Sequence, residues 1–88
     1  MFKDTTELTF DKRLETLSKR EWQVTEKILQ GLPNKSIANQ LFISERTVKF
    51  HCANIYQKLQ VRNRAYLMAH YFKKRFESGQ SSVGSILH

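Results

Sequence analysis

Cationic, amide and aromatic side chains recur at helical spacing near the middle of the chain, where they could contact DNA. The residues that would share one side of a helix are Arg46, Lys49, Phe50, Ala53 and Gln57. This side holds two cations and no acid. Arginine and lysine donate to phosphates and base edges, and an apolar group can meet the methyl of thymine. The pattern therefore favours noncovalent recognition of double-stranded DNA.

The element that must position these side chains is a helix predicted over residues 45–59. Ser44 precedes this helix as an N-cap residue. A second stripe of the same helix is apolar and is predicted to be buried; it consists of Val48, Cys52, Ile55 and Leu59. A buried stripe backed by a cationic face is what a helix in a DNA major groove requires.

A capping box marks the start of an earlier helix. Ser18 and Glu21 stand three residues apart, so each side chain can bond to the other's backbone N–H. Apolar residues follow at helical spacing, and Gly31 offers a left-handed stop. The expected helix covers about residues 19–30.

Two further helices complete an all-α, four-helix architecture. After Pro33, a short helix is expected over residues 34–41, with Asn34 as its cap or a first-turn residue. This helix and the one over residues 45–59 are joined by a short connection, which is the helix-turn-helix arrangement. Asn63 is a good cap for a last helix that runs to about residue 76.

The excess positive charge is confined to one part of the chain. The 88 residues allow one domain and carry a formal net charge of +7. The predicted lead-in (1–16) and flexible tail (77–88) are each slightly acidic, so the excess lies in the predicted domain (17–76). This favours a polyanionic partner, most simply nucleic acid. A basic domain without such a partner is the open alternative.

Several other classes of protein are disfavoured. The single Cys52 rules out an intramolecular disulfide, favours a reducing compartment, and next to His51 does not form a metal-ligand spacing. No apolar run is long enough to span a bilayer, and no signal peptide is apparent, so we expect a cytoplasmic protein. No nucleophile–base pair or phosphate-binding glycine loop points to an enzyme or to a cofactor.

Three segments together resemble the LuxR-type (NarL/FixJ, GerE-like) helix-turn-helix domain. They read LSKREWQV, LPNKSIANQLFISERTVKFH and QKLQVRNRAYLMA, within about residues 17–69. The resemblance implies a four-helix DNA-binding domain of a bacterial transcription regulator. It also implies that the third helix enters the major groove and that the fourth often makes the dimer contact. A pairing of Glu21 with Arg64 is a further hypothesis from the family pattern.

The candidate DNA contacts come partly from this resemblance and partly from the residues themselves. The expected base contacts are Arg46, Lys49, Phe50 and Ala53. The expected phosphate contacts are Asn34, Lys35, Ser36, Thr47, Asn54 and Lys58. For Phe50 the two interpretations are packing against the domain and exposure toward a thymine methyl, and we favour exposure.

The sequence departs from the family pattern at four positions. Gln60 stands where glycine is usual, and a left-handed cap without glycine costs roughly 1 kcal/mol, so a different turn is an alternative there. Pro33 replaces the usual Ser or Thr cap. Cys52 replaces a common Leu, and Ala53 replaces a longer polar residue, so one base contact is expected to be absent.

The last helix has more apolar side chains than one buried stripe needs. Those expected to face inward are Ala65, Met68, Ala69, Phe72 and Phe76. Tyr66, Leu67 and Tyr71 are left over. Of these, Leu67 and Tyr71 are predicted to form the seam of a homodimer that matches a palindromic site. The open alternative is that the N-terminal segment, with Leu8, Phe10 and Leu14, covers this seam.

Two alternatives to a DNA-binding regulator of this family remain. The helix-turn-helix could be a protein-interaction module that binds another regulator or RNA polymerase. Region 4 of a sigma factor has a similar pattern, although the QKLQVRNRA continuation fits the regulator family better. Whether the chain is a complete small protein or an excised C-terminal domain is also open, and Met1 and the unpatterned lead-in suit the former.

Overall fold

The computed structural model describes residues 9–77, and within this range it contains five α-helices and no strand. The helices are α1 (Phe10–Leu14), α2 (Lys19–Leu29), α3 (Asn34–Leu41), α4 (Glu45–Leu59) and α5 (Arg64–Glu77). The predicted all-α class is confirmed, and the last four helices match the predicted ones to within about a residue at each end. The short α1 is an additional element.

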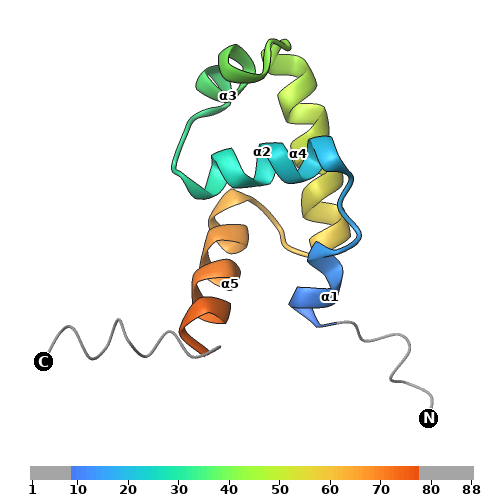
Figure 1. Ribbon diagram of the computed structural model, residues 1–88, viewed down its shortest axis with the longest axis vertical. Helices are drawn as coiled ribbons and strands as arrows, with labels where there is room; N and C mark the ends of the chain where they lie inside the picture. The colour runs from blue at the N-terminus through green and yellow to red at the C-terminus, as the bar shows by residue number, and fades with distance from the viewer. Residues whose placement is uncertain (1–8, 78–88) are drawn as a thin grey trace, which may run out of the picture.

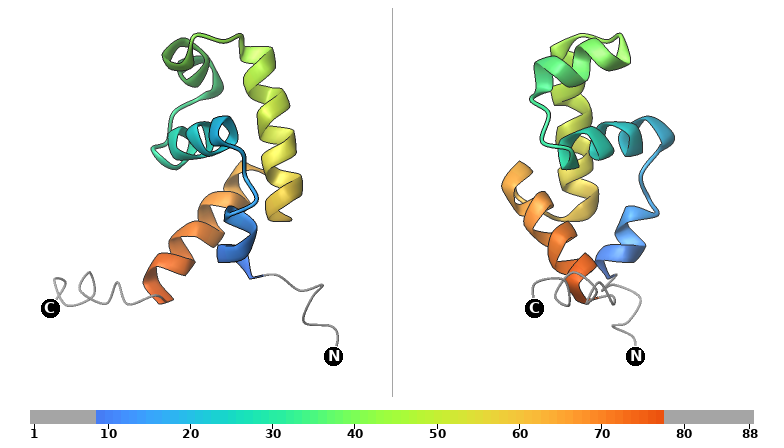
Figure 2. Two further views of the ribbon diagram at one scale, coloured as in Figure 1. Left: turned by 45° about the vertical axis from the view of Figure 1, so that its right-hand side comes forward. Right: turned by 60° about the vertical axis from the view of Figure 1, so that its left-hand side comes forward.

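The helices are arranged around α4, the longest of them. α3 and the first turns of α4 lie at one end of the molecule, α1 and α5 lie toward the other end, and α2 crosses between them (Figure 1). Turning the molecule keeps this arrangement (Figure 2). α4 packs against each of the other helices. This central position leaves only one side of α4 open to a partner.

The core is formed by aliphatic side chains from four helices. The buried hydrophobic residues are Val24, Ile28, Ile37, Ala38, Val48, Cys52, Ile55, Leu59 and Leu67. Four of them form the apolar stripe that was predicted for α4, and the burial of this stripe is confirmed. Because the stripe faces α2 and α3, the opposite side of α4 must face solvent.

Side chains begin three of the helices as the sequence predicts. Ser18 and Glu21 form the capping box of α2, with Ser18 N–H donating to Glu21 Oε1 over 2.9 Å. Ser44 Oγ accepts from the N–H of Thr47 at the start of α4, and Asn63 Oδ1 accepts from the N–H of Tyr66 at the start of α5. α3 differs, because Pro33 is its N-cap residue and makes no side-chain cap bond.

Three helices end in the same left-handed turn. Gly31 (φ 88°), Phe42 (φ 59°) and Gln60 (φ 58°) hold the left-handed position after α2, α3 and α4. After α4 the N–H of Val61 donates to the carbonyl of Tyr56 over 3.0 Å, which is the longer bond of a Schellman motif. The alternative of a different turn at Gln60 is therefore wrong. The turn is kept without glycine, at a cost of about 1 kcal/mol.

α1 precedes the predicted domain start at residue 17 and packs against other helices. Phe10 and Leu14 pack against the core. The Phe10 ring stacks on His70 of α5 with centroids 5.7 Å apart, and Asp11 pairs with Lys74 at 3.2 Å. Leu8, which was expected to join these residues, lies outside the described range.

Candidate nucleic-acid interface

The four predicted base-contacting side chains are exposed together on α4. We call Arg46, Lys49, Phe50 and Ala53 the reading face. The Phe50 side chain is 63% exposed, so it does not pack into the domain, and its ring meets His51 edge-on at 5.8 Å. An aromatic ring with this exposure is available for an apolar contact with a base.

The charge of the reading face is not neutralised by neighbouring carboxylates. Glu45 is the acid of the first turn of α4, where it complements the helix dipole. Among residues 9–77, no carboxylate forms an ion pair with Arg46, Lys49 or Lys35. These cations therefore remain available to a polyanion.

Three of the candidate phosphate contacts form a second group at the start of α3, on one flank of α4. Asn34, Lys35 and Ser36 make up the first turn of α3, whose backbone N–H groups receive no side-chain cap. Asn34 Oδ1 lies 4.0 Å from Cys52 Sγ, which places this turn directly beside α4. An uncapped helix N-terminus with amide, hydroxyl and ammonium groups is a suitable place for a phosphate.

Two of the remaining phosphate candidates lie on the opposite flank of the reading face. Thr47 is half-buried and its hydroxyl is 2.9 Å from Ser44 Oγ, so it already belongs to the cap of α4. Asn54 is half-buried two turns further along. Both positions are spaced to flank Phe50 on the helix.

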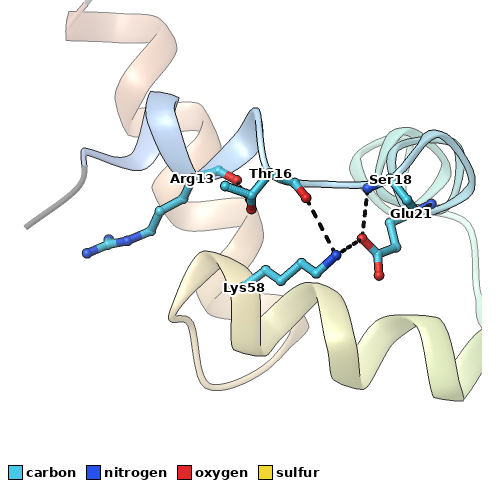
Figure 3. Close-up of polar contacts among 5 residues, drawn as sticks. All are labelled: Arg13, Thr16, Ser18, Glu21 and Lys58. Atoms are coloured by element: carbon cyan, nitrogen blue, oxygen red, sulfur yellow. Dashed lines mark hydrogen bonds and ion pairs between the residues drawn. The ribbon is translucent and has the colours of Figure 1, made fainter. Parts of the chain in front are cut away.

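Lys58 is in a different position from the other candidates. Its Nζ lies 2.7 Å from Glu21 Oε1 and 3.5 Å from the carbonyl oxygen of Thr16 (Figure 3). The ammonium is thus turned toward the start of α2 and away from the group at α3. Sequence periodicity places Lys58 on the flank of α4 but does not reveal this partner.

The expected pairing of Glu21 with Arg64 is wrong. The Arg64 guanidinium donates instead to the carbonyl oxygens of Leu32 at 2.5 Å and Ile28 at 3.4 Å. Glu21 lies in the first turn of α2, whereas these carbonyls lie at or just beyond its other end. Seven residues of helix separate Glu21 from Ile28 by about 10 Å. Arg64 therefore caps the end of α2, while Lys58 meets its beginning.

The surroundings of Glu21 keep it ionised. Burial raises the pKa of this carboxyl, but the hydrogen bond from Lys58, the N–H of Ser18 and the charge of Lys58 outweigh it and leave the pKa below its ordinary value. A carboxylate on a side chain that is only 8% exposed requires such partners, because an unpaired buried charge is costly.

The predicted orientation of α5 is wrong except at Met68, which packs against the core as predicted. Leu67 is fully buried, and Met68 and Tyr71 are half-buried beside it, so Leu67 cannot contribute to a dimer seam. Four exposed apolar side chains share one side of the helix instead, and we call them the α5 stripe: Ala65, Ala69, Phe72 and Phe76. Tyr66 is also exposed but lies off this side. Arg64 fixes this rotation through its bonds to the end of α2. Leu67 lies one turn later on the same side of the helix, so it also faces the core.

The N-terminal segment, which was the alternative to a partner subunit as the cover for α5, covers one flank of this helix only. Phe10 and Asp11 of α1 contact His70 and Lys74. The α5 stripe lies on another side of the helix, and its Phe72 and Phe76 are 43% and 63% exposed. α1 therefore covers part of α5 and leaves an apolar surface open.

A hollow lies beside the reading helix. It is lined by Gly31, Pro33, Asn34, Glu45, Tyr56 and Arg64. Burial raises the pKa of Tyr56 to about 12, and burial likewise raises the pKa of the neighbouring Cys52 thiol, so both stay protonated at neutral pH. Among residues 9–77, no cluster of His, Cys, Asp or Glu could hold a metal ion, and no helix is long and apolar enough to cross a membrane.

The chain is similar in sequence to known bacterial regulatory proteins. Residues 15–71 match the profile of a family described as bacterial regulatory proteins, luxR family. The transcriptional regulatory protein FixJ of Rhizobium meliloti is 50% identical over 56 residues, which are 64% of this chain and 28% of FixJ. The nitrate/nitrite response regulator protein NarP of Escherichia coli is 52% identical over 48 residues, which are 54% of this chain and 22% of NarP.

A solved structure, that of the response regulator StyR, has a similar fold. It aligns with a TM-score of 0.68 and 44% identity over 73% of this chain and 32% of that chain. The match thus spans 32% of StyR, 28% of FixJ and 22% of NarP. α1, at Phe10–Leu14, lies before the segment that the family profile matches.

Proposed function

Because this chain belongs to the LuxR family of bacterial regulatory proteins, whose helix-turn-helix domain binds double-stranded DNA to regulate transcription, we propose that α4 reads base edges in the major groove. The observation that carries the proposal is the reading face. It is exposed, carries two cations without carboxylate partners among the described residues, and presents an unpacked aromatic ring. We propose the bacterial cytoplasm, where the DNA lies, as the location of this activity.

Each residue of the reading face has a distinct role. Lys49 and Arg46 donate hydrogen bonds to base edges, for which guanine offers two acceptors in the major groove. Phe50 contacts a thymine methyl. Ala53 is too short to reach a base with a polar group, so it permits close approach of the helix and adds an apolar contact.

The phosphate contacts fix the register of α4 in the groove. Asn34, Lys35 and Ser36 hold a phosphate at the uncapped start of α3. Thr47 and Asn54 meet the strand on the other side of the groove. These contacts position the protein and carry no base preference.

The protein acts as a homodimer through the α5 stripe. Its small residues, Ala65 and Ala69, lie at one end and its large ones, Phe72 and Phe76, at the other. In an antiparallel two-fold pairing, the small end of one stripe meets the large end of the other, so the contact is self-complementary. Such a dimer matches a palindromic site.

The test is a selection of bound sequences from a random duplex pool at about 150 mM salt, where non-specific binding is weakened. We expect wild type to recover a palindromic motif and the double variant Lys49→Ala/Phe50→Ala to recover none. Lys19→Ala, which removes an exposed cation from α2, is the matched control and should recover the wild-type motif. A folded wild-type protein that recovers no motif would instead favour a module that binds RNA polymerase or another regulator.

A further inference from the structure

The pairing of Lys58 with Glu21 bears on how the domain meets DNA. We propose that Lys58 is a positioning residue of α4 and not a phosphate contact, and that Glu21 keeps its ammonium away from the DNA backbone. The inference rests on the proposed DNA-binding function and refines it. It assigns to two residues a part in setting the balance between specific and non-specific binding.

The carboxylate of Glu21 is held in place by bonds that do not involve Lys58. It accepts the N–H of Ser18 over 2.9 Å as half of the capping box, and the N–H of Glu21 donates to Ser18 Oγ over 3.1 Å. The Glu21 side chain is 8% exposed, whereas that of Lys58 is 40% exposed. A fixed, largely buried acceptor therefore draws in the end of a longer and otherwise mobile side chain.

Lys58 has a second acceptor in the segment that links α1 to α2. Its Nζ is 3.5 Å from the carbonyl oxygen of Thr16, and the Thr16 hydroxyl donates to the carbonyl of Arg13 over 2.7 Å. Figure 3 shows the ammonium between Thr16 and Glu21, while the Arg13 side chain points away from both. One ammonium thus ties the last turn of α4 to the α1–α2 link and to the start of α2.

Moving Lys58 to a phosphate would break this arrangement. Glu21 would remain as a buried carboxylate without its cation, and the loss of one member of such a pair is strongly unfavourable. Lys35, by contrast, is exposed and pairs with no carboxylate among the described residues, so it can contact DNA without such a loss. The two lysines therefore differ in what a phosphate contact requires them to give up.

The difference between Lys58 and Lys35 can be measured as a difference in the number of phosphates that the protein contacts. Each phosphate that a cation neutralises steepens the decrease of log K with log salt by about 0.9. Because Lys58 is withdrawn, it should add nothing to this slope. Its withdrawal also lowers non-specific affinity, which depends on phosphate contacts, and leaves base recognition by the reading face intact.

The experiment measures binding to the selected duplex and to a scrambled duplex between about 100 and 300 mM salt, a range over which phosphate contacts dominate the change. We expect Lys58→Met to keep the wild-type slope, whereas the matched control Lys35→Met should lower it by about 0.9. Glu21→Gln keeps an acceptor for Ser18 but frees the ammonium. It should steepen the slope by about 0.9 and bind the scrambled duplex several-fold more tightly.

The double variant Glu21→Gln/Lys58→Met closes the comparison. It leaves no buried charge unpaired, so it serves if Lys58→Met alone does not fold, and it should return the slope to the wild-type value. A smaller slope in Lys58→Met than in wild type would show a direct phosphate contact and overturn the inference. The same conclusion would follow if Glu21→Gln had the wild-type slope and the double variant had a smaller one. A Glu21→Gln variant that loses stability with no change of slope or of non-specific affinity would overturn it too, since the pair would then be merely structural. Wild type that binds neither duplex would be the failure of the proposed function itself.

Discussion

The outward sides of α4 and α5 present the same two residue types, alanine and phenylalanine, in different electrostatic surroundings. On α4, Phe50 and Ala53 stand among Arg46 and Lys49, with the single acid of the helix in its first turn. On α5, two alanines and two phenylalanines form a continuous apolar stripe. The difference teaches that one small domain offers two kinds of surface, one suited to a polyanion and the other to a second protein surface.

The comparison depends first on the rotation of α5, and one pair of substitutions tests it. Leu67→Ala removes a fully buried side chain and should lower the free energy of unfolding by about 2–5 kcal/mol. Phe76→Ala removes a larger but mainly exposed side chain and should change it by less than about 0.5 kcal/mol. Urea denaturation measures both, and the reverse order would show that α5 is rotated with Phe76 inward.

The second way to break the comparison is to place charge on the α5 stripe. Phe72→Glu/Phe76→Glu should leave the domain folded but weaken binding to the palindromic duplex at least tenfold, about 1.4 kcal/mol. Binding to a single half-site should be unchanged, because the reading face is untouched. Equilibrium sedimentation should show a monomer, whereas a persistent dimer would exclude the stripe as its interface.

A smaller effect sharpens the account of α4. Replacing the contacted thymine by uracil removes one methyl group, so wild type should lose about 1 kcal/mol of binding free energy. Phe50→Ala should bind the thymine and uracil duplexes equally. Titration of both proteins with both duplexes gives the coupling, and an equal uracil effect in the variant would assign the methyl contact to another side chain.

The smallest expected effect concerns the turn that joins the two helices. Gln60→Gly relieves the left-handed strain and should raise the free energy of unfolding by up to about 1 kcal/mol. Gly31→Ala is the reciprocal control and should lower it by a similar amount, since Gly31 has the same type of backbone conformation (φ 88°). Thermal unfolding would show both shifts, and a destabilised Gln60→Gly would mean that the glutamine side chain contributes more than the strain costs.

The two helices also show what could be predicted from sequence. On α4 the apolar residues recur every three or four positions and the polar residues lie between them. This pattern places Val48 and Ile55 inward and Lys49 outward. Ser18 with Glu21, and Ser44, mark helix starts through bonds that span only three residues. Local chemistry of this kind is visible in the sequence and is confirmed.

The errors arise where distant segments decide the outcome. α5 has apolar residues around most of its circumference, so periodicity could not choose between Leu67 and Phe76, and the bonds of Arg64 to the end of α2 make the choice. The partner of Glu21 depends equally on which helix end lies beside it. The spacing of residues along the chain does not show which helix ends lie side by side in the fold.

The single thiol of Cys52 gives the domain an internal reporter of its own opening. It is 5% exposed in the core stripe of the reading helix, and burial raises its pKa, so a thiol reagent can react only after α4 separates from the core. Its labelling rate under native conditions therefore follows the population of opened molecules. Duplex DNA, by binding only the closed form, should slow the labelling in proportion to its occupancy.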